Sequence, residues 1–313
     1  MLHAGPRLAG PAPDFGIVAF DLNGAVPAAL TNLGVGVVRG SCDWPTLEPS
    51  PGVYAWDCAD NVIVGAARLG LRSYMTVGCT PAWAARGAGC GAMPTDVADW
   101  YRFVQSFVAR YSQFQTVLGV WNEPNLTLRD TADGANYALL YINASGARDS
   151  VNPHFVLAGP ETSHHALASG YYVRTMDYIQ GARALAPQDL VTVHWYPDGP
   201  PLAAYMDRVS ADGVAGTNDV WLSEVGAATP DAQAQADFYR QVIATFTAHS
   251  THRWTHLVLY RLWDGQPCCS EAILNADYTP KAAFAVLRLA IQQYQSTAID
   301  PRPGHEDTRA RTR

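Results

Sequence analysis

Eight short apolar runs, separated by longer amphipathic stretches, constrain the fold of this chain more than any other feature. We interpret the runs as buried parallel strands. They are Phe15–Phe20, Val35–Arg39, Leu71–Val77, Val117–Trp121, Phe155–Ala158, Leu190–Trp195, Val220–Ser223 and His256–Leu262. Helical spacing of apolar residues is found in Ala59–Leu69, Asp96–Tyr111, Asp133–Asp149, Tyr171–Ala184, Asp231–His249 and Lys281–Tyr294, and more weakly in Pro201–Val209 and after the first run.

This alternation predicts an α/β protein with a single (β/α)8 TIM barrel. A doubly wound sheet is the alternative, but no GxGxxG follows the first run. We assign the barrel to residues 14–297 of the 313 residues. Residues 1–13, rich in Gly, Pro and Ala, are expected to form an N-terminal arm, and the polar residues 298–313 a flexible tail.

Charge and hydropathy exclude several kinds of partner. Acidic residues outnumber basic ones by 28 to 21, and no basic cluster occurs, so a nucleic-acid or anionic-membrane partner is not expected. No apolar run approaches the roughly 20 residues that span a bilayer. The first residues do not resemble a signal peptide. The chain is therefore expected to be either an intracellular protein or an exported one whose signal has been removed.

The six cysteines leave the disulfide state open. They are Cys42, Cys58, Cys79, Cys90, Cys268 and Cys269. A bridge between Cys79 and Cys90 would close a short loop, whereas one between the adjacent Cys268 and Cys269 would be strained. The spacing matches no zinc site. Disulfides and free thiols are therefore both open interpretations.

Polar residues cluster where the predicted strands end, and the carboxyl ends of barrel strands carry the active site. Glu123 and Glu224 each close an apolar run, where a carboxylate is costly unless it is solvated, paired or protonated. Two carboxyls sharing one site have separated pKa values, which supplies one proton donor and one ionised nucleophile. Hydrolysis of a glycosidic bond requires such a pair. The alternative is a structural ion pair with Arg39 or another base.

Other residues near the strand ends have both a functional and a structural interpretation. Trp44 and Trp83, in the second and third loops, could stack on a sugar or pack in the core. Weaker candidates for lining the site are Asp21, Asn23, Glu161, His164 and His165. We expect Tyr260 and Arg261 to pack inside the barrel, and Glu48 to maintain loop structure.

Several motifs resemble those of clan A glycoside hydrolases, over most of residues 15–293. Val120-Trp121-Asn122-Glu123-Pro124-Asn125 resembles the strand-four Asn-Glu-Pro motif, and Trp221-Leu222-Ser223-Glu224-Val225-Gly226 resembles the strand-seven motif. Val193-His194-Trp195-Tyr196, Leu262-Trp263-Asp264 and Arg39 are similar to the motifs of strands six, eight and two. The second loop, Leu47 to Asp57, is also similar. The features are closest to family 39 or to families near family 5.

The resemblance implies a role for each matching residue. Glu123 would be the general acid/base and Glu224 the nucleophile of a retaining β-glycosidase. Asn122 would bind the sugar 2-hydroxyl, Trp263 would stack on the sugar, and Arg39, His194 and Tyr196 would support substrate and nucleophile. No metal or organic cofactor is implied.

The implied substrate is a carbohydrate, and we expect a secreted monomer. Family 39 β-xylosidases carry a β-sandwich domain for which this sequence has no room, which slightly favours an endo-glycanase. An exo-acting β-glycosidase and a catalytically silent carbohydrate-binding barrel remain alternatives. A barrel enzyme with metal-dependent or phosphate-binding chemistry is a weaker one.

Overall fold

The chain forms one closed barrel of eight parallel strands in the order of the sequence. A computed structural model describes residues 15–85, 89–128, 134–164, 181, 184–186, 188–213, 219–249, 254–265 and 270–299. The strands are β1 (Phe15–Val18), β2 (Val37–Ser41), β3 (Arg72–Val77), β4 (Thr116–Val120), β5 (Val156–Thr162), β6 (Leu190–Trp195), β7 (Val220–Val225) and β8 (Trp254–Leu259). Parallel pairing of β1 with β8 closes the barrel.

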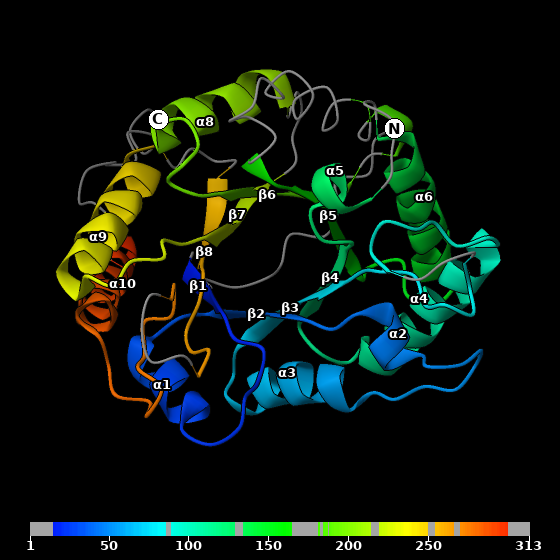
Figure 1. Ribbon diagram of the computed structural model, residues 1–313, viewed down its shortest axis with the longest axis horizontal. Helices are drawn as coiled ribbons and strands as arrows, with labels where there is room; N and C mark the ends of the chain where they lie inside the picture. Colours follow the sequence, from blue (N-terminus) through cyan, green and yellow to red (C-terminus); the bar gives the residue numbers. More distant parts are fainter. Residues whose placement is uncertain are drawn as a thin grey trace, which may run out of the picture.

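Helices surround this barrel on its outside (Figure 1). The longer ones are α1 (Val26–Leu33), α3 (Asp57–Arg68), α4 (Val97–Tyr111), α6 (Ala135–Asp149), α8 (Leu202–Arg208), α9 (Ala232–His249) and α10 (Ala282–Ile299). The shorter α2 (Trp44–Leu47) and α5 (Pro124–Thr127) follow β2 and β4, and a π-helical turn, Val209–Gly213, continues α8. Asp96 caps α4 by accepting a hydrogen bond from the amide of Ala98.

The predicted (β/α)8 barrel is therefore confirmed, with differences at some element boundaries. The strand predicted at Phe155–Ala158 continues to Thr162, and the one predicted to reach Leu262 ends at Leu259. The arm 1–13, most of the helix predicted at Tyr171–Ala184, and residues 300–313 lie outside the described residues. The helix α10 ends at Ile299, two residues into the predicted tail.

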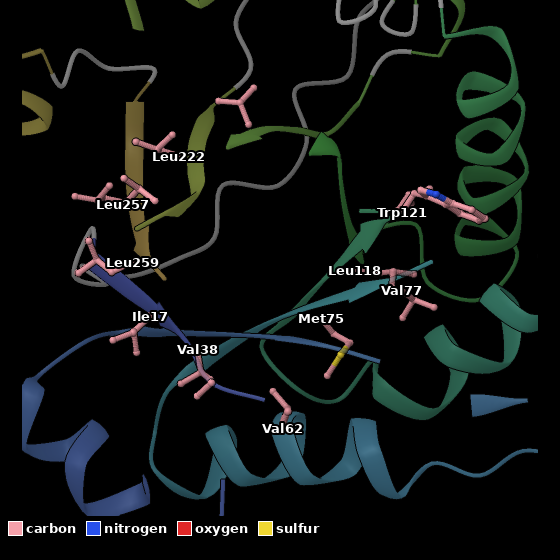
Figure 2. Packing of buried hydrophobic residues seen from close by; sticks show 14 of the residues in the cluster. Ile17, Val38, Val62, Met75, Val77, Leu118, Trp121, Leu222, Leu257 and Leu259 are labelled. Carbon is pink, nitrogen blue, oxygen red and sulfur yellow. The ribbon is translucent and has the colours of Figure 1, made fainter. Parts of the chain in front are cut away.

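The main core lies between the strands and the helices. Ile17, Val38 and Met75 point outward from their strands, and Val62 of α3 faces β2 (Figure 2). Gly40 permits this approach, because a Cβ at that position would lie 2.8 Å from the Val62 methyl carbons. A larger residue at position 40 would therefore push α3 away from β2.

The barrel interior has an apolar zone and, toward the carboxyl ends of the strands, a polar one. Inward-pointing Val18, Val37, Val117 and Val258 pack with Trp221 and other apolar residues. Arg39, Thr76 and His194 occupy inward positions further along their strands and are also buried. Charged and polar side chains therefore lie next to the apolar zone inside the barrel, on the side of the carboxyl ends of the strands.

Two disulfides are found in the segments that follow β2 and β3. Cys42 is bonded to Cys58, and Cys79 to Cys90, so of the two open interpretations the disulfide holds for these four cysteines. Asp43 lies beside the second bridge, close enough to suggest a metal site, but both sulfurs are already bonded. Cys268 and Cys269 lie outside the described residues. No described helix is both long and apolar enough to cross a bilayer.

Candidate active site

Glu123 and Glu224 lie in one polar cluster, although 101 residues separate them in the sequence. Glu224 belongs to β7, and Glu123 follows β4 with a left-handed backbone (φ 45°) directly before α5. Their side chains are 19% and 13% exposed for Glu123 and Glu224, respectively. Both carboxyls are thus partly open to solvent, whereas Arg39 and His194 in the same cluster are buried.

Two donors hold the Glu224 carboxylate. Arg39 donates from Nη1 to Oε2 at 2.7 Å, and the Tyr196 hydroxyl donates a short hydrogen bond to Oε1. Burial, followed by the neighbouring charge of Glu224, raises the pKa of Tyr196, so its hydroxyl keeps its proton. The two oxygens of Glu224 are therefore oriented from different strands, Oε2 from β2 and Oε1 from the end of β6.

His194 connects the two carboxyls. Its Nδ1 atom lies 3.0 Å from Oε1 of Glu123 and 3.8 Å from Oε2 of Glu224. Burial would lower the pKa of His194, but the charge of Glu224 and contacts with Glu123 and Glu161 raise it to about 9. His194 is thus a buried cation at neutral pH. A register shift between β6 and β7 pairs it with Glu224.

Asn122 also belongs to this cluster. Its Oδ1 atom accepts a hydrogen bond from Arg39 Nη2 at 3.0 Å. This contact orients the amide so that its NH2 group points away from the guanidinium. The contact thus fixes which end of the Asn122 amide faces Arg39.

Glu161, considered above as a residue lining the site, is instead fully buried beneath it. Its carboxylate accepts from Arg39 at 2.7 Å and from Thr76, and makes a short hydrogen bond with Tyr74. Tyr74 and Thr76 were not identified from the sequence. Their two-residue spacing in β3, which places both on the inward face, was the available signal.

Trp44, one of the expected sugar-stacking residues, is fully buried. Its indole packs against Trp100 and Phe103 of α4, and its Nε1 donates to Glu48. Of the two interpretations given above, core packing rather than sugar stacking holds for Trp44, because its ring faces α4 and not solvent. Trp83 is partly exposed, packs edge-on against Trp44, and donates to the Glu48 carbonyl oxygen. Glu48 thus maintains the loop, as expected.

Trp263 and Tyr260 have different surroundings beyond the end of β8. Trp263 is partly exposed and stacks on Tyr278 at 4.7 Å between ring centroids. Tyr260, expected inside the barrel, lies after the strand ends and is partly exposed beside Tyr196, with 6.2 Å between centroids. It also contacts Phe20, which is 39% exposed. Tyr260 therefore connects the Glu224 cluster to an exposed aromatic ring.

His164 supports Tyr196 from the end of β5. The backbone amide of Tyr196 donates to His164 Nδ1 at 3.1 Å, while Nε2 lies 2.8 Å from Asp198 Oδ1. Its ring is fully buried, so His164 does not contact solvent. Asp21 and Asn23, the other weak candidates, are exposed and bonded to each other; His165 lies outside the described residues.

Comparison with known proteins is consistent with this site. The profile of the family described as "Glycosyl hydrolase catalytic core" matches residues 91–280, more than half of the chain. That range includes Glu123, His194 and Glu224. No curated protein matches the sequence significantly.

Solved structures share the fold at low sequence identity. A family 39 glycoside hydrolase from Bacteroides cellulosilyticus WH2 aligns with a TM-score of 0.72 and 17% identity over 90% of this chain. The chain spans 64% of that protein's length. A family 39 β-xylosidase from Caulobacter crescentus aligns with a TM-score of 0.69 and 18% identity. The alignment covers 90% of this chain and 72% of the β-xylosidase chain.

A psychrophilic family 10 endo-β-1,4-xylanase aligns with a TM-score of 0.67 and 16% identity, over 88% of this chain and 96% of its own. At such identities these similarities concern the fold. The family match, the closed barrel and the carboxyl pair at its carboxyl end agree with one another. The chain belongs to the glycosyl hydrolase catalytic core family and folds as a closed (β/α)8 barrel.

Proposed function

We propose that this protein is a glycoside hydrolase that cleaves β-glycosidic bonds with retention of configuration, using Glu224 as nucleophile and Glu123 as acid/base. The observation that carries the proposal is the position of His194 between the two carboxyls. The Glu123 and Glu224 oxygens lie 3.0 and 3.8 Å from its Nδ1 atom. Their separation therefore cannot exceed the combined length of these contacts. This limit of about 6.8 Å includes the separation of about 5–5.5 Å that is typical of retaining pairs and only the lowest end of the range of about 6.5–9.5 Å found in inverting pairs. The contacts therefore support a retaining mechanism.

The surroundings of each carboxyl suit its role. Glu224 receives hydrogen bonds from Arg39 and Tyr196, which stabilise a carboxylate and aim it. It attacks the anomeric carbon while Glu123 gives its proton to the departing glycosidic oxygen. Glu123 then removes a proton from water, the water oxygen bonds to the anomeric carbon, and the bond to Glu224 breaks. Asn122 donates to the sugar 2-hydroxyl, where hydrogen bonds strengthen in the transition state.

For the substrate we propose a β-linked polysaccharide cut internally, as by a glucanase or xylanase. Support comes from the family 10 endo-β-1,4-xylanase, whose chain is matched over 96% of its length. The similarity to a family 39 β-xylosidase favours exo action on short substrates as the second candidate. A silent binding barrel is disfavoured, because both carboxyls and their supporting contacts are present.

Hydrolysis of a substrate panel tests this function. Aryl β-xyloside, glucoside, mannoside and galactoside would be compared with xylan, β-glucan and mannan, following the anomer of the fresh product by NMR. Release of short oligosaccharides, β anomer first, supports the retaining endo-enzyme. Monosaccharide release alone supports the exo candidate. Loss of turnover in Glu224→Ala, with recovery by azide and an inverted glycosyl azide product, identifies the nucleophile; near-wild-type turnover contradicts it.

We also propose that the protein works outside the cytoplasm as a monomer. The two disulfides support export, because such bonds persist in oxidising compartments. Quantifying the protein in culture supernatant and cell extract would test the compartment. Sedimentation of the purified protein would test the monomer.

A further inference from the structure

Glu161 is a fully buried carboxylate that no step of the proposed mechanism uses. We propose that it is a positioning residue: it holds the Arg39 guanidinium against Glu224 and supplies the negative charge that balances Arg39 and His194 beneath the reacting groups. This role rests on the proposed function of Glu123 and Glu224.

The carboxylate of Glu161 is held on both oxygens. Oε2 accepts from Arg39 Nη2 at 2.7 Å, and Oε1 accepts a short hydrogen bond from Tyr74. The Thr76 hydroxyl lies 3.0 and 3.1 Å from the two oxygens. Burial would raise the pKa of Glu161, but the charge of Arg39 and contacts with His194 and Tyr74 lower it below its usual value. Glu161 is therefore ionised despite complete burial.

The backbone is shaped to place this side chain. The register between β5 and β6 shifts at Glu161, and its φ of 48° lies in the left-handed region that non-glycine residues rarely adopt. On the neighbouring β4, Gly119 leaves the space that the carboxylate occupies, since a Cβ there would lie 2.0 Å from Glu161 Oε1. Two independent local features thus accommodate one buried charge.

Arg39 transmits this restraint to the nucleophile. Its guanidinium is rigid and planar, so fixing one nitrogen fixes the directions of the others. Nη2 is held by Glu161 and Asn122, while Nη1 donates to Glu224. Without the Glu161 contact, the side chain could rotate and Glu224 would lose a fixed donor.

Charge balance is the second part of the role. Arg39 from β2 and His194 from β6 are the buried cations of the cluster. Facing them are Glu161 on β5, Glu123 after β4 and Glu224 on β7, with the hydroxyls of Tyr74 and Tyr196. Removing the charge of Glu161 makes the cluster more positive. The pKa of His194 should then fall, and the ionisations on which turnover depends should occur at lower pH.

A purely structural ion pair predicts a different result. It would lower the melting temperature when broken but leave the pH dependence of the folded enzyme unchanged. The pH dependence of kcat/KM therefore separates the two roles, because its limits report the ionisation of the essential acid and base.

The test is Glu161→Gln, assayed on an aryl β-glycoside that the wild type hydrolyses. We expect kcat to fall roughly 10- to 100-fold with KM nearly unchanged. Both limits of the pH profile should move down by roughly one pH unit. The matched control is Glu48→Gln, a buried glutamate that bonds Trp44 beside α4; its pH limits should coincide with those of the wild type.

A folded Glu161→Gln with wild-type pH limits would overturn the proposal. If that variant does not fold, Tyr74→Phe carries the test. This substitution removes the hydrogen bond that the Tyr74 hydroxyl donates to Glu161 and keeps the ion pair of Glu161 with Arg39. We therefore expect a several-fold lower kcat at unchanged pH limits. A wild-type kcat would overturn the positioning role.

A wild type inactive on every substrate would instead refute the proposed function. An NMR titration of the His194 ring then still tests the charge balance. We expect a lower His194 pKa in Glu161→Gln, and equal values would contradict the inference.

Discussion

The imidazole Nδ1 of His194 lies 3.0 Å from Oε1 of Glu123, in a cluster that also contains Glu161 and Glu224. A single buried ring thus connects the two strand ends that carry the carboxyl pair. Its contacts raise its pKa, and this shift has consequences for stability as well as for catalysis.

The raised pKa of His194 predicts that part of the stability is lost at alkaline pH. The value is about 9 in the folded protein and ordinarily 6.5. The contribution is fully present below pH 6.5 and disappears as pH rises through 9, and it amounts to about 3 kcal/mol. Urea unfolding at pH 6 and pH 10 should show this loss in the wild type. His194→Gln should show a smaller one, and equal losses would contradict the assignment.

Arg39→Lys should impair both folding and catalysis. Lysine cannot reproduce the planar fork that contacts Glu161, Glu224 and Asn122 together. We expect destabilisation of about 3–5 kcal/mol if the buried pair is broken, and a loss in kcat of about 10²-fold.

The exposed pair between Arg110 and Asp60 provides the control for Arg39→Lys. Arg110→Lys should cost less than about 1 kcal/mol and leave kcat unchanged. Chemical unfolding and steady-state kinetics measure both effects. Similar costs for the two substitutions would contradict the special role of Arg39.

His164 should matter only through Tyr196. It accepts from the Tyr196 amide and does not touch Glu123 or Glu224 among the contacts described. His164→Leu should lower kcat roughly tenfold, and the double variant with Tyr196→Phe should be no slower than Tyr196→Phe alone. Rate losses that multiply would indicate two independent effects. The melting temperatures of all three variants serve as the folding control.

Tyr260 and Trp263 are the two candidates for the ring that stacks on the sugar, a role that the sequence assigned to Trp263. Tyr260 lies beside Tyr196, which binds Glu224, whereas Trp263 packs on Tyr278. We expect Tyr260→Ala to reduce kcat/KM by roughly fivefold on an aryl glycoside, since aromatic contacts contribute of the order of 1 kcal/mol. Trp263→Ala should have the smaller effect. The reverse order would restore the original assignment.

The disulfide between Cys42 and Cys58 should stabilise the fold measurably. It joins residues 16 apart and lies between β2 and α3. For a closed loop of that size the expected contribution is about 3 kcal/mol. Cys42→Ser with Cys58→Ser should lower the melting temperature, and dithiothreitol should then have less further effect than in the wild type. An unchanged melting temperature would contradict this prediction.

The eight apolar runs were sufficient to predict the barrel, because strands buried on both faces need continuous apolar sequence whatever their neighbours are. The same order predicted that Arg39, Glu123, His194 and Glu224 would meet, since parallel strands end at one rim. Their contacts with one another follow that expectation. Roles in catalysis remain proposals for the experiments above.

Tertiary structure alone decided which of the remaining candidates face the site. A register shift in β5 directs Glu161 beneath Arg39, and no local pattern in the sequence signals such a shift. Packing against α4 buries Trp44, and the end of β8 at Leu259 rather than Leu262 places Tyr260 beside Tyr196. Periodicity specifies which element a residue belongs to. The direction of a side chain at a strand end depends on bulges, turns and contacts between residues distant in sequence, so only the folded chain determines it.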